Sequence, residues 1–598
     1  MTERRAQLAG RIGGGRRRLL AAGVLAGAMA TGSGLAPPSV DAAGARGTLY
    51  VQAKAPAGGD GSRRNPFRSL ARVRRASAPG DRILVLRPRR RGAVLEGGIR
   101  LKPRQRLIGA GRARRPNRGK PPALSNDDAA VLKGDVVRLA DGVVVRNLRI
   151  MGAARGAIYG RNIRRARIAG NEITGHNSTC ARGFHIPPFN VPTTVPGVGI
   201  PISDGLHNGW AGIMVDADRG RSRIRIDRNY VHHSECGDGI DVRAMGRARI
   251  RARITRNRVR VLRQGSDLES VLAIGLQSAD SSLLVARVRR NREGNLGNVG
   301  DPGFGPLGAD SEGVFINPTG PSRIDVVVAR NRYRNPRDLG GFSANGLEFV
   351  SMGDGARGRV VIRDSRFTRT PGDVLEQLAL GTNARLRLRL DGVVASGSTG
   401  FARTGIGNTI LIPGNNGDCM LAASGGAGNR IQTRIADSEL TDCANNGLTF
   451  GSAVANGTGP TNTLDLEISR SELTGNQGAN LRVGNISGLQ TLMAKVEHSD
   501  LSDSQGQGVT GLANASFENL GTTTAATLDL GGGGLGSAGG NCLEGGLLAA
   551  ELIAYSVTAE GNWWGAPGPP GPGRVLAVGG TLDGTPGLDS RPSGCGRP

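Results

Sequence analysis

Ionisable side chains that could do chemistry gather in one short window of this chain. Five of its six histidines lie between residues 176 and 233, with several carboxylates in or beside the window. The residues are His176, His185, His207, His232, His233, Asp204, Asp216, Asp218, Glu235, Asp238 and Asp241. A histidine can act as a general base, and two carboxylates about 5–9.5 Å apart can cleave a glycosidic bond. Clustered carboxylate oxygens could also hold Ca²⁺.

Seven residues of this window are our candidates for a site. His232, Asp241, Asp238 and His185 are candidates for catalysis, with Asp241 paired either with Asp238 or with Asp216. Trp210, His176 and Asp216 are candidates for substrate binding, because an indole can stack on a sugar ring. Simpler roles stay open: Asp238 as an ordinary Asp-Gly turn residue, Asp241 as a solvated surface residue and Trp210 as a loop anchor.

A repeat must position these residues. The stretch Asn229–Val242 gives two short strands and a polar turn, and similar units start at Asn331, Ser438, Ser471 and Ser499. Units of about 30 residues with short strands predict a solenoid, whose coils stack about 4.8 Å apart. Within this repeat Asp241 points outward, between the inward Ile240 and Val242. The matching outward positions are His185, Met214, Phe315, Glu348 and Thr449, which form a candidate ligand strip.

The two ends of the repeat region resemble a known family. A strand at Leu49–Val51, a turn at Gly58–Phe67, a short helix at Phe67–Ala76 and a strand at Pro79–Leu86 open it, and Gly561–Gly565 closes it. This order is similar to that of secreted pectate-lyase-like right-handed parallel β-helix proteins, over about residues 48–565. The resemblance implies an all-β fold, a right-handed parallel β-helix of roughly ten or more coils with an N-terminal cap. We expect a signal peptide at 1–42, the cap and first coils at 43–111, the β-helix at 112–565 and a Pro/Gly-rich tail at 566–598.

The resemblance implies two kinds of function. That superfamily includes lyases, hydrolases and epimerases as well as non-catalytic surface proteins. The Arg-x-Pro-x-x-Arg motif of pectate lyases and the Gly-His-Gly motif of polygalacturonases are absent from this sequence, so no catalytic residue is carried over. Our first hypothesis is an exported protein that acts on or binds an acidic polysaccharide, as a lyase or hydrolase. The alternative is a non-catalytic, adhesive cell-surface protein.

The charge of the chain is strongly uneven. The net charge is +29, but residues 405–598 hold 8 basic and 17 acidic residues, so residues 1–404 carry +38. This pattern indicates either a basic face for an anionic polymer or a genome that favours Arg at exposed strand positions. Nucleic acid is the weaker partner, because aromatic residues for base stacking make up only 3% of the chain.

Export is expected from the first residues. Arg16–Arg18, the apolar Leu19–Ala30 and small residues up to Ala42 are typical of a secretory signal, the alternative being an uncleaved anchor. No other apolar span follows, so we expect a secreted or cell-surface protein with no membrane span after cleavage. In an oxidising compartment its six cysteines can pair in fifteen ways, and positions in the repeat favour Cys180–Cys236 and Cys419–Cys443. Cys542 and Cys595 would then close the C-terminal region.

A proline-rich insertion interrupts the repeat at the candidate site. Prolines at residues 187–201 prevent pairing as a central strand, so residues 187–209 should leave the coil as a loop. Long loops in compact repeats are often functional, although this one could simply cover apolar coil surface. If the chain has a ligand site, we expect it on the coils around residues 176–243, beneath or beside this loop.

Overall fold

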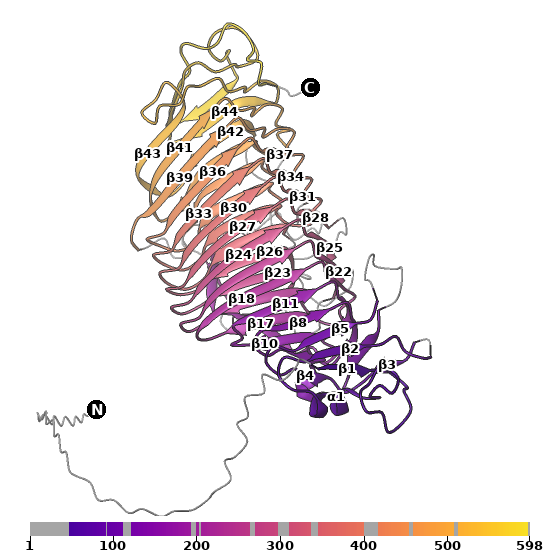
Figure 1. Cartoon of the computed structure of the whole chain (residues 1–598). Helices are drawn as coiled ribbons and strands as arrows, with labels where there is room; N and C mark the ends of the chain where they lie inside the picture. Colours follow the sequence, from indigo (N-terminus) through magenta and orange to yellow (C-terminus); the bar gives the residue numbers. More distant parts are fainter. Residues whose placement is uncertain are drawn as a thin grey trace, which may run out of the picture. The chain divides into compact units, whose positions relative to one another are not determined.

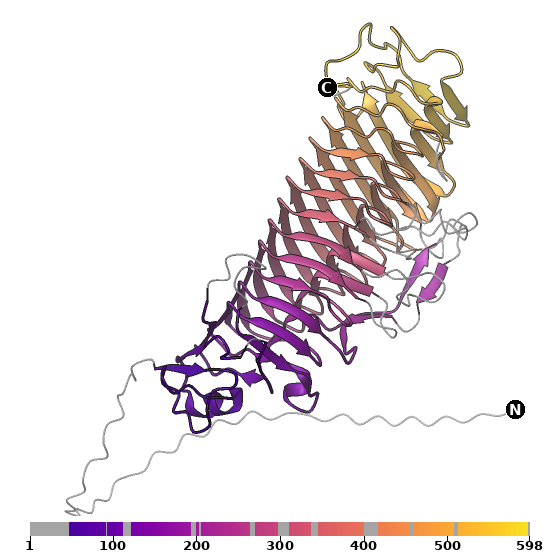
Figure 2. The same ribbon diagram turned by 90° about the vertical axis from the view of Figure 1, so that its right-hand side faces the viewer.

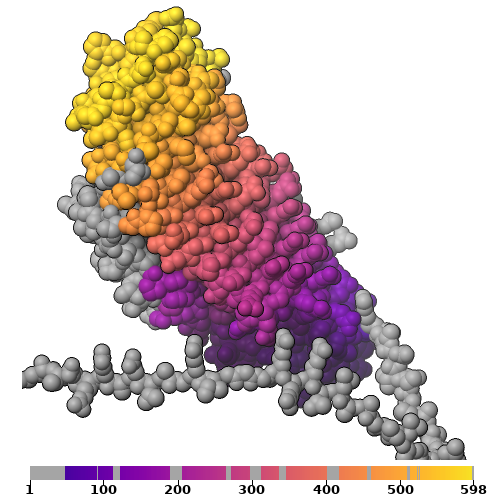
Figure 3. All heavy atoms as spheres, turned by 90° about the vertical axis from the view of Figure 1, so that its left-hand side faces the viewer, coloured from indigo at the N-terminus to yellow at the C-terminus, as the bar shows by residue number. Residues whose placement is uncertain are grey.

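A computed structural model describes most of the chain after residue 46. The described residues are 47–90, 92–111, 121–192, 199–202, 205–263, 270–296, 310–335, 345–399, 417–453, 459–507 and 512–595. The expected signal peptide therefore lies outside the described residues. Residues 46–598 form one compact unit, in which strands from successive coils lie side by side in sequence order (Figure 1). In the space-filling view the same order runs along the surface from indigo to yellow (Figure 3).

Three long parallel sheets, here called A, B and C, build this unit. Sheet A contains β1 (Thr48–Val51), β2 (Arg82–Val85), β5 (Arg106–Gly109), β8 (Val143–Arg146), β11 (Arg165–Ala169), β18 (Arg221–Asp227), β21 (Arg249–Thr255), β24 (Leu283–Arg289), β27 (Arg323–Ala329), β30 (Arg357–Arg363), β33 (Arg385–Asp391), β36 (Arg430–Ala436), β39 (Asn462–Ser469), β41 (Leu489–Glu497), β43 (Thr522–Gly531), β45 (Ser556–Ala559) and β47 (Thr581–Asp583).

Sheets B and C complete the coils. Sheet B contains β3 (Val94–Leu95), β6 (Ala123–Asn126), β9 (Arg149–Ala153), β12 (Glu172–His176), β19 (Tyr230–His232), β22 (Arg258–Leu262), β25 (Arg292–Leu296), β28 (Arg332–Arg334), β31 (Arg366–Thr368), β34 (Val394–Ser396) and β37 (Glu439–Thr441). Sheet C contains β4 (Ile99–Arg100), β7 (Val137–Arg138), β10 (Ile158–Arg161), β17 (Ile213–Ala217), β20 (Ile240–Ala244), β23 (Ser270–Ser278), β26 (Asp310–Pro318), β29 (Leu347–Ser351), β32 (Leu375–Ala379), β35 (Met420–Ser424), β38 (Leu448–Ala453), β40 (Leu481–Ser487), β42 (Ala513–Asn519), β44 (Leu548–Ile553) and β46 (Val575–Val578).

One coil runs through the three sheets before the next begins. The chain passes through β17, β18 and β19 and then enters β20, which pairs with β17 in parallel with Ile213 opposite Ile240. Alternate residues of each strand point inward, so Ile224 and Ile226 of β18 join a continuous apolar core while Arg223 and Arg225 remain exposed. The all-β parallel β-helix expected from the sequence is confirmed.

A ladder of polar side chains explains the first residue of each repeat unit. At the corner between sheets A and B, the side-chain amide of Asn229 donates to Asn257 Oδ1 (3.0 Å), and Asn257 donates to Asn291 Oδ1 (3.1 Å). In later coils serine hydroxyls take the same place, as when the backbone N–H of Ser438 donates to Ser471 Oγ. These buried hydrogen bonds tie each coil to the next, which accounts for the recurrence of Asn and Ser.

Both ends of the unit carry ordered structure. The expected short helix is α1 (Leu70–Ala76), with Ser69 as its N-cap and with Leu70 and Val73 buried in the core. A single 3₁₀ turn, η1, covers Leu132–Gly134. Beyond residue 565, β46 and β47 extend sheets C and A, so this part of the tail packs on the last coil.

Two of the three disulfides join positions that the repeat brings together, and the third ties the tail to the β-helix. The expected pairs Cys180–Cys236, Cys419–Cys443 and Cys542–Cys595 are all confirmed. Across the part of the chain that the structure describes, no helix is both long and apolar enough to cross a membrane.

The proline-rich insertion leaves the coil as expected. It begins in β13 (Arg182–Ile186), which pairs antiparallel with β16 (Leu206–Gly209), and Asn208 of β16 pairs in parallel with Ser270 at the start of β23 in sheet C. Further out, β14 (Phe189–Pro192) pairs antiparallel with β15 (Gly199–Ile202). We call β13 to β16 the hairpin; its outer strands are the small magenta pair that stands off the stack in Figure 2.

Candidate functional site

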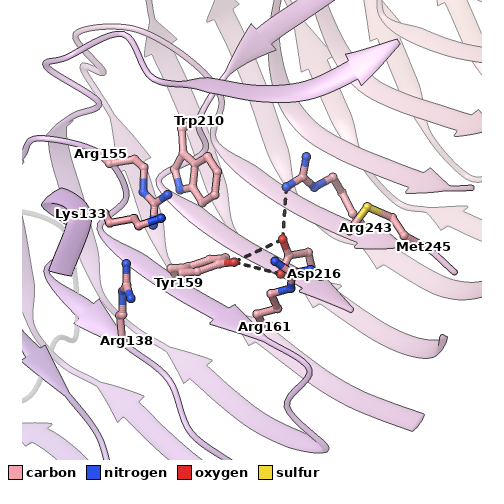
Figure 4. Close-up of a pocket in the computed structure, with 9 residues that line it drawn as sticks. All are labelled: Lys133, Arg138, Arg155, Tyr159, Arg161, Trp210, Asp216, Arg243 and Met245. Carbon is pink, nitrogen blue, oxygen red and sulfur yellow. Dashed lines mark hydrogen bonds and ion pairs between the residues drawn. The ribbon is translucent and has the colours of Figure 1, made fainter. Parts of the chain in front are cut away.

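A basic pocket lies on the outer face of sheet C in the early coils. Its volume is about 500 Å³. The residues that line it are Lys133, Arg138, Arg155, Tyr159, Arg161, Trp210, Asp216, Arg243 and Met245, and Figure 4 shows them around the Tyr159 ring. Three of the nine lining residues, Trp210, Asp216 and Arg243, belong to the window of residues 176–243 in which the sequence places a ligand site, and the other six lie outside it.

The parallel register positions the floor of the pocket. Tyr159 and Arg161 are outward residues of β10, and Arg161 lies opposite Asp216 of β17. Asp216 in turn lies opposite Arg243 of β20. Because side chains in register on adjacent strands lie close together, an arginine, a carboxylate and a second arginine follow one another across three coils.

Asp216 is the acidic centre of this arrangement. Its carboxylate accepts a hydrogen bond from the Tyr159 hydroxyl at 3.3 Å and lies 3.3 Å from Nη2 of Arg243. Burial raises the pKa of Asp216, and the charges of Arg243 and Arg161 oppose that shift. Burial, followed by the Asp216 charge, raises the pKa of Tyr159 to about 12, so the phenol stays protonated and donates.

A second carboxylate holds the opposite wall. Asp135, whose side chain is fully buried, bridges Nε of Arg138 (2.9 Å) and Nη2 of Arg155 (2.7 Å). The Arg155 guanidinium stands 3.9 Å from the ring centroid of Trp210 and 5.1 Å from that of Tyr159. These contacts fix Arg155 between two aromatic rings, which is a favourable position for a cation.

The pocket carries more positive than negative charge. Lys133, Arg138, Arg155, Arg161 and Arg243 line it, and among the described residues the only carboxylates paired with them are Asp135, Asp216 and Asp218. Five cations therefore face three carboxylates, which leaves an excess of two positive charges. Such a site favours an anionic ligand, since guanidinium groups bind carboxylates in a bidentate manner.

Asp241 is outward, but it is not solvated. It shares its rung of sheet C with Met214 and precedes Phe315, Glu348 and Thr449 in the same register, as the sequence predicted. Its side chain is nevertheless 0% exposed. Phe184 of the hairpin covers it: a Cβ added to Gly275 would lie 2.6 Å from both Asp241 and the Phe184 ring. The expectation of a surface carboxylate outside the packed interior was wrong, because the sequence does not reveal this cover.

Asp238 has the geometry of a turn residue. Its Oδ1 accepts the backbone N–H of Leu272 at 2.7 Å, and its Oδ2 accepts the side-chain amide of Asn208 at 3.0 Å. Four coils further along the stack, the carboxylate of Asp373 accepts the corresponding bond from the backbone N–H of Asp418 on the next coil. Asp238 therefore joins the base of the hairpin to the next coil, which supports the simpler of its two roles.

The two carboxyls Asp238 and Asp241 perturb each other. Burial raises the pKa of Asp238 well above its usual range, and repulsion from Asp241 adds to the shift. Burial likewise raises the pKa of Asp241 to about 7, against the opposing charge of Arg243. Two buried carboxyls that interact in this way titrate as a pair and retain a proton near neutral pH.

The histidines do not share one groove. His176 is fully buried, with Nε2 2.8 Å from the carbonyl of Asp238, and burial lowers its pKa to about 4. His185 faces His207 across the antiparallel strands β13 and β16, so its expected place in the parallel register with Asp241 was wrong. His232 lies on sheet B, stacked on Tyr230 with its ring centroid 4.0 Å away.

The seven candidates thus fall into separate environments. Trp210 and Asp216 line the pocket, whereas His176, Asp238 and Asp241 are buried beneath the hairpin base. Sequence reasoning missed Lys133, Arg138, Arg155, Tyr159, Arg161 and Arg243, because single arginines are inconspicuous in an arginine-rich chain. Among the described residues, no three His, Cys, Asp or Glu side chains gather as metal ligands, so the suggested Ca²⁺ gains no site there.

Comparisons with known proteins assign no family. No family model and no curated protein matches the chain. Among solved structures, the native GH136 lacto-N-biosidase from Eubacterium ramulus matches with a TM-score of 0.29 and 11% identity, over 65% of this chain and 64% of that one. Its selenomethionine derivative matches with a TM-score of 0.31 and 12% identity, over 80% of this chain and 67% of that one. The native match spans just under two thirds of that enzyme, and likeness at this level assigns no activity.

Proposed function

We propose that this protein binds an acidic polysaccharide and seats one sugar carboxylate in the basic pocket. The observation that carries the proposal is the excess of two positive charges around the Tyr159 and Trp210 rings. A uronic acid matches this combination, because it joins a carboxylate to a ring with apolar C–H faces.

Each part of the pocket has a task in this proposal. Lys133 and Arg161 can take the sugar carboxylate, since Lys133 has no ion pair among the described residues and Arg161 is half exposed. Asp216 offers acceptor atoms to sugar hydroxyls, and the protonated Tyr159 holds Asp216 in place. Arg155 is engaged by Asp135 and Trp210, so it shapes the wall of the pocket.

Binding fits this geometry better than cleavage by a hydrolase. A hydrolase needs two carboxyls beside the substrate, and Asp216 is the only carboxylate among the residues that line the pocket. Asp241, its diagonal neighbour in the register, is buried beneath Phe184. We therefore favour a non-catalytic, exported binding protein, and three disulfides are what an oxidising extracellular compartment permits.

Calorimetry with trigalacturonate tests this proposal. We expect the native protein to bind the trimer and Lys133→Met/Arg161→Gln to bind it about 30-fold more weakly, since each lost charge-assisted hydrogen bond costs about 1 kcal/mol or more. The matched control is Arg332→Gln/Arg366→Gln, which removes the same charge from exposed sheet B positions and should bind normally.

Two results would overturn the proposal. The first is unchanged affinity in the pocket variant, and the second is equal affinity for the methyl ester of the trimer, which carries no charge. Incubation of the native protein with longer polyuronates, followed by ultraviolet absorbance and reducing-end assays, tests cleavage. Any unsaturated product or new reducing end would replace the binding role with a lyase or hydrolase role.

A further inference from the structure

Arginine side chains form regular rows on the outer face of sheet A. We define the arginine face as the exposed, outward residues of β11, β18, β21 and β24, namely Arg165, Arg167, Arg221, Arg223, Arg225, Arg249, Arg251, Arg253, Arg287 and Arg289. One row contains Arg167, Arg225, Arg253 and Arg287 in direct register over four coils. A second row contains Arg165, Arg223 and Arg251.

These arginines have no acidic partner in the part of the chain that the structure describes. Among the described residues, no ion pair involves any side chain of the arginine face, whereas Arg434 of the same sheet pairs with Glu467 at 3.1 Å. Like charges directly opposite each other on adjacent strands destabilise a sheet. Rows of like charge are therefore locally unfavourable for the fold, and such unfavourable arrangements are expected where a surface has a function.

A general preference for arginine does not explain this segregation. Such a preference would fill exposed positions with Arg but would not remove the carboxylates between them. Further along the same sheet the rows do change sign, with Asp465 and Glu467 in β39 and Glu497 in β41. Among the described residues, Arg357, Arg359, Arg385 and Arg387 of β30 and β33 are also exposed and without an ion pair. The unpaired positive charge therefore extends from β11 to β33 and ends where the acidic residues of β39 and β41 begin, and it can act as one surface.

A groove runs beside this face. Its volume is about 740 Å³, and it is lined by Arg104, Arg164 and members of the arginine face. Its one acidic lining residue is Asp141, which pairs with Arg164 at 2.8 Å. The groove gives an anionic chain a partly enclosed path across the coils.

The regular rows select the kind of partner. Arginines that repeat about every 4.8 Å along the stack match an extended polymer with one charge per unit better than a single anion. The outward residues of β18 and β21 include no aromatic ring for base stacking and no large apolar side chain for insertion into a membrane. We propose that the arginine face binds an acidic polysaccharide lengthwise along the coils, at a site separate from the pocket on sheet C.

Titration with long polygalacturonate tests this inference. The variant Arg225→Gln/Arg251→Gln/Arg253→Gln should bind the polymer about 10-fold more weakly and with a shallower salt dependence, because three exposed ionic contacts and their released counterions are lost. Its affinity for trigalacturonate should not change, since the trimer reports on the pocket. The matched control Arg363→Gln/Arg434→Gln/Arg470→Gln removes three arginines that have ion pairs and should bind the polymer normally.

The outcomes separate this surface from the pocket. Loss of polymer binding in the face variant, with normal trimer binding, supports the arginine face even if the pocket variant behaves as native protein. Unchanged polymer binding in the face variant, or an equal loss in the control, would overturn it. Tighter binding of a single-stranded oligonucleotide, or of phosphatidylglycerol vesicles, than of polygalacturonate would also overturn the choice of partner.

Discussion

Replacing Asp241 with asparagine should stabilise the protein at neutral and alkaline pH. The Asp241 carboxyl is 0% exposed and has a pKa of about 7, whereas an unfolded chain gives aspartate a pKa of about 3.9. Between these two values the folded protein holds a proton that the unfolded chain has released. Stability therefore falls as pH rises from about 4 to 7, and the loss is complete above pH 7.

The size of the effect follows from the shift. A difference of about 3 pKa units corresponds to roughly 4 kcal/mol, which the buried charge costs at pH 8. Asn has the shape of Asp without the charge, so Asp241→Asn should recover up to about 4 kcal/mol at pH 8 and almost nothing at pH 4. The compact unit comprises residues 46–598, and a unit of this size has an unfolding entropy of about 1.2 kcal/mol/K. Dividing about 4 kcal/mol by this entropy gives a Tm increase of about 3 °C.

Thermal unfolding of native protein and variant at pH 4, 6 and 8 measures this difference. Distant buried carboxyls, such as Glu293 and Asp373, titrate in both proteins, so the comparison cancels most of their contribution. Asp238 does not cancel, because the variant removes the Asp241 charge that raises its pKa, so the measured difference belongs to the pair. The control Asp325→Asn removes a partly exposed carboxylate that pairs with Arg323 at 3.2 Å, and it should give no gain at pH 8. An equal Tm for Asp241→Asn and native protein at pH 8, or a gain of the same size at pH 4, would refute the reasoning.

Two further predictions concern the links between coils. Replacing both Cys180 and Cys236 with serine removes a disulfide that spans 56 residues and should lower the free energy of unfolding by about 4 kcal/mol. Mass analysis of the intact protein without reductant should show no free thiol among its six cysteines, and a free Cys180 would contradict this. Asn257→Ala should cost about 2 kcal/mol in denaturant unfolding, because Asn229 and Asn291 lose a buried partner, and Asn257→Ser should cost less, since Ser438 fills the equivalent place; equal costs for the two variants would argue against the ladder.

The fold could be predicted from the sequence because the spacing of the repeat units shows which residues lie opposite each other on adjacent coils. The units that start at Asn229, Asn331 and Ser438 recur because their first residue stands in a ladder that every coil must continue. The strict alternation around Asp241 likewise predicted that Met214 lies beside it, and the repeat placed Cys180 beside Cys236. The recurring Asn or Ser and the alternation of inward and outward residues are both local patterns, and they are visible in the sequence because the stacked coils repeat them.

Only part of the candidate pocket could be predicted from the sequence, since Trp210 and Asp216 are the only two of the seven candidates that line it. Clustering of histidines between 176 and 233 suggested one groove, but a coil turns through three sheets within this window, so neighbours in sequence face different directions. His232 on sheet B and Asp241 on sheet C belong to the same repeat unit and still point away from each other. Sequence alone also could not show that Phe184 folds back over Asp241, because the hairpin departs from the repeat.

The residues that sequence reasoning missed share one physical cause. Arg161, Asp216 and Arg243 meet because their strands are in register, although they are far apart in the chain and belong to no motif. The rows of the arginine face arise in the same way from β11, β18 and β21. In a stacked fold, an outward side chain forms a site together with the side chains in register with it on adjacent coils, which are distant in the sequence. The uneven charge along the sequence therefore corresponds to an uneven charge on the surface, and the pocket on sheet C and the arginine face on sheet A are the two basic sites that we propose from it.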